Sequence, residues 1–143
     1  MEILNLAAQT GFLAFLAAAS FTDVKRRSLN VIFICIGFTA GFVFQTALGE
    51  LLLWEMLAGA ALGAAAAVIS RISSQAIGYG DSFMIAACGA WLGFYGCACL
   101  LMVSLFIMAL FGIAAMAFKK AKGKDALPFM PFLLAGYIVM LAV

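Results

Sequence analysis

Two aspartates, Asp23 and Asp81, are the residues of this chain best suited to catalysis, because each follows or precedes a long apolar segment. An ionisable side chain in or beside a bilayer is expensive to place, so it indicates function. When two carboxyls lie close together, one of them keeps its proton at neutral pH. The ionised carboxyl can then activate a water while the protonated one polarises a carbonyl. The pair therefore predicts hydrolysis of a peptide bond with no metal and no other cofactor.

Asp81 ends the sequence Gly78-Tyr79-Gly80-Asp81, which we expect to form a flexible turn. Glycine adopts backbone angles that are closed to other residues. We therefore expect Gly78 and Gly80 to let an extended substrate strand come close to Asp81. A simpler structural role for Asp81 is that of a helix N-cap.

Asp23 lies near the end of the first predicted helix, where the helix dipole disfavours negative charge, whereas Asp81 lies at a helix start, where negative charge is favoured. These positions favour Asp23 as the acid and Asp81 as the base. The alternative structural role for Asp23 is an ion pair with Lys25, Arg26 or Arg27.

The composition is that of an integral membrane protein. Apolar residues make up 68% of the 143 positions, and only 8 basic and 6 acidic residues are present. Histidine is absent, which excludes His metal sites, Ser/His/Asp triads and Cys/His pairs. No basic face can form for nucleic acid. The four cysteines lie in apolar segments without a Cys-x-x-Cys pair, so they are predicted to be buried apolar residues: Cys35, Cys88, Cys97 and Cys99.

The predicted fold is an all-α bundle of about six transmembrane helices, since a spanning helix needs about 20 apolar residues. The run from 83 to 118 is too long for one span, and a turn is expected within Gly93-Phe94-Tyr95-Gly96. The whole chain, 1–143, is then one transmembrane peptidase domain in the lipid bilayer. The predicted segments are 3–22, 30–48, 51–70, 82–96, 97–118 and 126–143.

All eight basic residues fall after the first, third and fifth predicted spans, so the positive-inside rule makes these loops cytoplasmic and places both chain ends outside. Asp23 and Asp81 then meet at the cytoplasmic membrane face. For Lys25, Arg27 and Arg71, positive-inside anchoring is the simpler account, and steering of headgroups or substrate is the alternative. The basic residues are Lys25, Arg26, Arg27, Arg71, Lys119, Lys120, Lys122 and Lys124.

Three segments of the chain together resemble the type IV prepilin peptidases, a family of membrane aspartic proteases of bacteria and archaea. The first is Asp23-Val24-Lys25-Arg26-Arg27-Ser28-Leu29-Asn30. The second is the Gly-x-Gly-Asp motif that ends at Asp81. The third is Pro128-Phe129-Met130-Pro131-Phe132-Leu133, at the start of the last predicted span.

The resemblance implies that Asp23 and Asp81 are the catalytic pair and that the substrate is a pilin-like precursor with a short basic leader. It implies cleavage at the inner face of the bacterial or archaeal cytoplasmic membrane. The chain is similar to the short, peptidase-only type found with Flp-type pili, with no methyltransferase domain. It departs from the family at Leu29, where proline is usual, and at Ser82 and Phe83, where an aliphatic residue and lysine are common.

Other functions compete with this prediction. Proteases of the presenilin and signal-peptide-peptidase kind share Gly-x-Gly-Asp, but they have more spans and a first aspartate deep within a helix. A proton or cation transporter would place its acidic residues near the midplane of the membrane. An inactive homologue that assists pilus assembly is the remaining alternative. The sequence leaves open the oligomeric state and the precursor that is cleaved.

Overall fold

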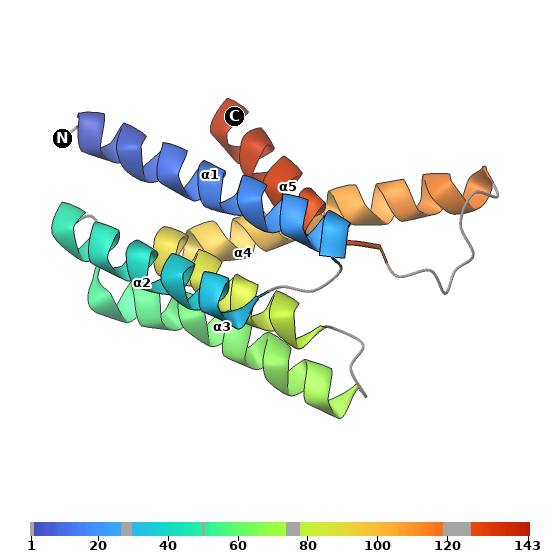
Figure 1. Cartoon of the computed structure of the whole chain (residues 1–143), viewed down its shortest axis with the longest axis horizontal. Coiled ribbons are helices and arrows are strands. Elements are labelled where there is room, and N and C mark those ends of the chain that lie inside the picture. Colours follow the sequence, from blue (N-terminus) through green and yellow to red (C-terminus); the bar gives the residue numbers. More distant parts are fainter. Residues whose placement is uncertain (1, 27–29, 50, 74–77, 119–126) are drawn as a thin grey trace.

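The computed structural model describes residues 2–26, 30–49, 51–73, 78–118 and 127–143. Within these ranges the chain is all α-helical, as predicted (Figure 1). Arg27 and the predicted lysine loop of Lys119, Lys120, Lys122 and Lys124 lie outside the described residues. The helices are α1 (Glu2–Arg26), α2 (Val31–Leu48), α3 (Leu53–Ile72), α4 (Tyr79–Ala117) and α5 (Met130–Ala142).

Helix α4 is broken at Gly93, whose backbone angles (φ 68°, ψ −174°) are not helical. The Cys97 thiol donates a hydrogen bond to the Ile85 carbonyl at 3.6 Å. In an unbroken helix, twelve residues would separate these groups by about 18 Å. The chain therefore reverses direction at Gly93, and residues 94–117 run back along residues 79–92 (Figure 1). The predicted turn between the fourth and fifth segments is confirmed.

The helices match the six predicted apolar segments once the break in α4 is counted. Helices α2, α3 and α4 are long and apolar enough to cross a membrane, whereas α5 is apolar but has only 13 residues. Many large apolar side chains face outward, among them Ile36, Leu57 and Phe106. Such a surface suits a lipid environment. That six helices span the bilayer, with both ends outside, stays a prediction.

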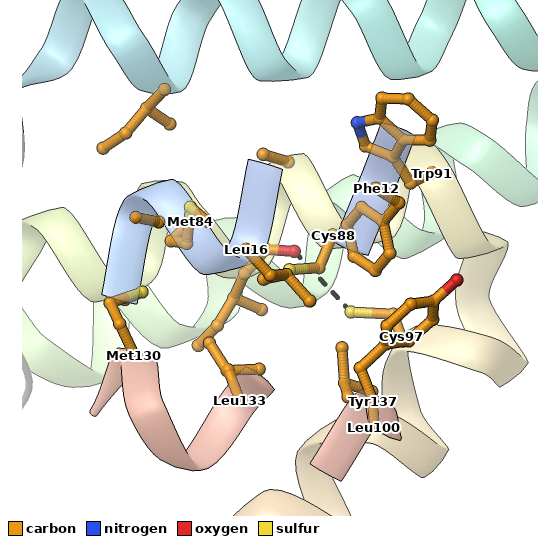
Figure 2. Packing of buried hydrophobic residues seen from close by; sticks show 14 of the residues in the cluster. Phe12, Leu16, Met84, Cys88, Trp91, Cys97, Leu100, Met130, Leu133 and Tyr137 are labelled. Carbon is orange, nitrogen blue, oxygen red and sulfur yellow. Dashed lines mark hydrogen bonds between the residues drawn. The ribbon is translucent and has the colours of Figure 1, made fainter. Parts of the chain in front are cut away.

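The core of the bundle lies where α1, both halves of α4 and α5 meet (Figure 2). The Phe12 ring packs against Trp91, with centroids 5.4 Å apart, and edge-to-face against Tyr137 at 4.7 Å. Burial of these side chains ties the first helix to the last. The labelled residues of this cluster in Figure 2 are Phe12, Leu16, Met84, Cys88, Trp91, Cys97, Leu100, Met130, Leu133 and Tyr137.

Closely spaced glycines bring the helix backbones into contact. A Cβ atom on Gly59 would lie 2.6 Å from the Gly89 carbonyl oxygen, so α3 and α4 touch through their backbones. On α2, Gly37 lies against the Phe15 ring and Gly41 against the Trp91 indole. Gly37 with Gly41, and Gly59 with Gly63, are pairs of small residues spaced four apart, and they serve helix packing within the chain.

Trp91 joins α4 to α2 through two hydrogen bonds. Its indole N–H donates to the Gly37 carbonyl at 2.8 Å, and its own carbonyl accepts a bond from the Gln45 side-chain amide. The last carbonyls before a helix break have no partner within the helix. Gln45 thus satisfies a carbonyl that the reversal at Gly93 leaves without a helical donor.

Candidate active site

Asp23 and Asp81 lie at the same end of the bundle. Asp23 is in the last turn of α1, and Asp81 is in the first turn of α4. In Figure 1 these helix ends, together with the start of α2 and the end of α3, lie opposite the chain termini. Both aspartates therefore belong to helices, although the predicted segments 3–22 and 82–96 stopped one residue short of each of them.

The two carboxyls are close enough to interact electrostatically, and both side chains are half-buried. Two neighbouring carboxyls cannot both ionise cheaply. The structure therefore brings together the two residues that the sequence singled out, over a separation of 58 positions (81 minus 23).

Asp23 is held by the last helix as well as by its own. Its Oδ2 atom accepts a hydrogen bond from the backbone N–H of Met130 at 3.3 Å, across 107 positions of sequence. Met130 is the first residue of α5, and no side chain of the preceding residue caps this helix. The first N–H groups of a helix lack helical partners. The Asp23 carboxylate therefore caps α5 from another helix.

The α5 contact changes the expected distribution of the proton. The expectation that Asp23 is the acid counted only the negative end of α1. The carboxylate also faces the N-terminus of α5, where the dipole and a donated hydrogen bond favour negative charge. The dipole argument therefore no longer separates the two residues, since the Asp23 carboxylate faces the N-terminus of α5 and Asp81 lies in the first turn of α4.

The Gly-x-Gly-Asp segment begins a helix and is not a flexible turn. Gly78 is the N-cap residue of α4 with ordinary extended angles (φ −62°, ψ 140°), and Gly80 is helical. The expectation that both glycines supply unusual backbone angles is therefore wrong, because the helix starts earlier than predicted. Asp81 is the third helical residue and is not the N-cap.

Gly78 matters for the space beside Asp81. A Cβ atom at position 78 would lie 3.3 Å from Asp81 Oδ2 and 3.7 Å from its Cγ. The first distance is tighter than an ordinary van der Waals contact. The absence of a side chain at Gly78 therefore leaves room for the Asp81 carboxyl on the side of the helix start.

The sequence did not predict that Met130 binds Asp23, because the backbone N–H of Met130 and not its side chain makes this hydrogen bond. The sequence held an indirect signal in Pro128 and Pro131. Pro131 is the second residue of α5, where proline is well tolerated because that N–H has no helical partner. This pair marked a helix start, but nothing in the sequence connected that start to Asp23.

The cysteines lie apart from this site. Cys88 and Cys97 are buried in the core as predicted, but Cys35 and Cys99 are exposed, so the prediction of burial is wrong for these two. All four thiols are free. Across the part of the chain that the structure describes, no three His, Cys, Asp or Glu side chains gather to form a metal site.

The chain is also similar to known proteins in sequence. Residues 10–113 match the model of the type IV leader peptidase family. The prepilin leader peptidase/N-methyltransferase of Aeromonas salmonicida strain A449 is 37% identical over 68 residues, which cover 47% of this chain and 23% of that protein. The Aeromonas hydrophila protein of the same name is 35% identical over 68 residues, with the same coverage.

The protein of that name from Burkholderia pseudomallei strain K96243 is 37% identical over 62 residues, which cover 43% of this chain and 20% of that protein. The matched stretch is thus less than a quarter of the length of these relatives. No solved structure gives a significant match. The family match covers most of this chain, including both aspartates, and on that basis the chain belongs to the type IV leader peptidase family.

Proposed function

We propose that this protein is an aspartic endopeptidase that removes the short basic leader of type IV pilin-like precursors of the Flp type. The single observation that carries the proposal is that Asp23 and Asp81 lie at the same end of the bundle, near enough for their charges to interact. Family membership supplies the reaction class, which is cleavage of a leader peptide. The aspartates supply the means, because the pair needs neither a metal nor a covalent intermediate.

In the proposed reaction the ionised aspartate removes a proton from a water molecule, and the water oxygen attacks the scissile carbonyl carbon. The protonated aspartate donates its proton to the carbonyl oxygen, which gives a neutral tetrahedral diol. Collapse of the diol breaks the C–N bond. The aspartate that took the water proton passes it to the leaving nitrogen, while the other aspartate, now ionised, takes a proton from a diol hydroxyl. Each aspartate thus ends the cycle in the protonation state in which it began.

We assign the charge to Asp23 and the proton to Asp81. The hydrogen bond that the Met130 N–H donates to Asp23 supports an ionised Asp23. Carboxyl carbon NMR of protein labelled at its aspartates, Asp23, Asp81 and Asp125, tests the assignment. At pH 5, the neutral carboxyl signal of the wild-type protein should be the one that D81N removes. Removal of that signal by D23N instead restores Asp23 as the acid.

The proposed setting is the cytoplasmic face of the membrane, with six spans and both termini outside. It is supported by the positions of Lys25, Arg26 and Arg71, which end α1 and α3 near the aspartates. Basic residues concentrate on the cytoplasmic side of membrane proteins. A precursor whose basic leader precedes an apolar helix would then present its cleavage site at the depth of the pair.

Coexpression with candidate pilin precursors tests the function. Wild-type protein should yield a shortened precursor on a gel, and D23N and D81N should each lower the cleavage rate by about a hundredfold or more, as expected for loss of a catalytic acid or base. E55Q is the matched control. Glu55 begins α3 at the opposite end of the bundle, where its carboxylate accepts a bond from the Leu52 N–H at 3.3 Å.

If either aspartate variant still cleaves the precursor, the proposal that the two aspartates act as a catalytic pair is wrong. Loss in both variants, with normal protein levels and an active E55Q, contradicts the transporter and assembly-factor alternatives. An equal loss in E55Q shows that carboxylate replacement harms folding in general, and a folded-state measurement on all three variants then separates the two causes.

A further inference from the structure

A second site is present at the same end of the bundle, on the side of α1 that faces α2. It is a cavity of about 350 Å³ between the last turn of α1 and the first turns of α2. Neither catalytic aspartate lines it. The lining residues are Phe21, Thr22, Lys25, Arg26, Asn30 and Phe33.

We propose that this cavity binds the phosphate headgroup of an anionic phospholipid. The inference does not depend on peptidase activity. Two basic side chains, Lys25 and Arg26, line a pocket that no acidic side chain lines among the described residues. Lysine and arginine are the usual partners of phosphate oxygens in proteins.

The start of α2 adds further donors. Asn30 is the N-cap of α2, and its Oδ1 atom accepts a bond from the Ile32 N–H at 3.1 Å. The side-chain NH₂ group of Asn30 is therefore turned away from this bond and can donate to an anion. The N-terminus of α2 also favours negative charge.

Two nearby groups oppose an anion. The C-terminus of α1 is the negative end of that helix. Asp23 also belongs to this turn, but its carboxylate bonds to Met130 on α5 and does not line the cavity. The groups that favour an anion are the charges of Lys25 and Arg26 and the N-terminus of α2. They outweigh the C-terminus of α1, because the Asp23 carboxylate does not line the cavity.

The apolar part of the lining indicates a lipid and not a free phosphate ion. Phe21 is 68% exposed, and its ring lies 5.6 Å from the Lys25 ammonium. Phe33 lines the other side of the cavity and stacks on Phe15 with centroids 5.1 Å apart. Val31 and Ile32 are exposed beside it. An occupant with a charged head and apolar chains fits this combination, whereas inorganic phosphate would leave the aromatic surface unused.

Native mass spectrometry of the purified full chain tests the proposal, with phosphatidylglycerol and phosphatidylcholine of identical acyl chains as competing probes. Wild-type protein should retain phosphatidylglycerol preferentially. Each of K25Q and R26Q should reduce that preference about fivefold, on the order of what one basic residue contributes near an anionic surface. R71Q is the matched control, since it removes one positive charge from the end of α3, away from the cavity.

The double variant K25R/R26K keeps both charges and should keep the preference. If K25Q and R26Q keep the wild-type preference for phosphatidylglycerol, or if R71Q loses as much of it, the proposed lipid site is wrong. The preference then comes from the general positive charge of the surface. Millimolar inorganic phosphate should fail to displace the lipid. Displacement by phosphate would overturn the assignment to a lipid and identify a site for soluble anions. Melting temperatures of all variants exclude unfolding as the cause of lost binding.

Discussion

The Asp23 carboxylate caps helix α5 by accepting a hydrogen bond from the Met130 N–H at 3.3 Å. One side chain therefore serves the fold and the proposed chemistry together. The bond fixes the start of the last helix against the first helix, and the contact of Phe12 with Tyr137 joins the same two helices further along. Two different substitutions of Asp23 should therefore separate its structural role from its chemical role.

Asp23→Asn should abolish cleavage and leave the fold intact, because the amide oxygen can still accept the Met130 bond. Asp23→Ala should abolish cleavage and also lower the free energy of unfolding by about 1 kcal/mol, the usual effect of losing a helix cap. Thermal unfolding in detergent, followed by circular dichroism, measures the difference. Equal stability of the two variants would show that the α5 cap contributes nothing.

Gly78→Ala should impair cleavage without unfolding the protein. The backbone angles of Gly78 suit alanine, but the new Cβ would press on the Asp81 carboxyl from 3.3 Å. A displaced catalytic group lowers the rate by roughly ten- to a hundredfold. Gly112→Ala is the control, because its Cβ would meet Leu127 at an ordinary 3.8 Å. Rates and melting temperatures should be unchanged in the control, and equal activity in both variants would refute the steric argument.

Gly93→Ala should destabilise the protein more than Gly49→Ala. Both glycines have positive φ, but Gly93 (φ 68°, ψ −174°) lies in a region essentially restricted to glycine, with a cost on the order of 1–3 kcal/mol for other residues. Gly49 (φ 67°, ψ 14°) is left-handed helical, which asparagine tolerates. Asparagine should therefore be accepted at position 49 and rejected at 93. Unfolding midpoints of the four variants check this ranking.

Gln45→Leu should lower the free energy of unfolding by about 1–3 kcal/mol, because the Trp91 carbonyl would lose its donor inside the bundle. Thr46→Val is the control on the neighbouring residue, whose exposed hydroxyl bonds only to carbonyls of its own helix. Chemical denaturation of both variants should show a clear loss for position 45 alone. If both variants lose the same stability, the interhelical bond is not the cause.

Several elements were predictable because each depends on local sequence. Long apolar segments separated by polar clusters predicted an all-α bundle, and Gly93 was within the only predicted break in the run from 83 to 118. The sequence also singled out Asp23 and Asp81, since carboxylates are rare at the edges of apolar segments. The distribution of basic residues then placed both aspartates at one end of the bundle.

Other features depended on contacts between distant segments. The sequence could not show that a backbone N–H at Met130 binds Asp23, because every residue except proline carries that group. The prediction for Gly78 was wrong, because this glycine matters for the space that it leaves beside Asp81 and not for its backbone angles. Residue types and spacing thus determined which groups are available for chemistry. Only the packing of α1, α4 and α5 decided which of them meet, since hydrogen bonds and electrostatic coupling depend on distances that a sequence does not contain.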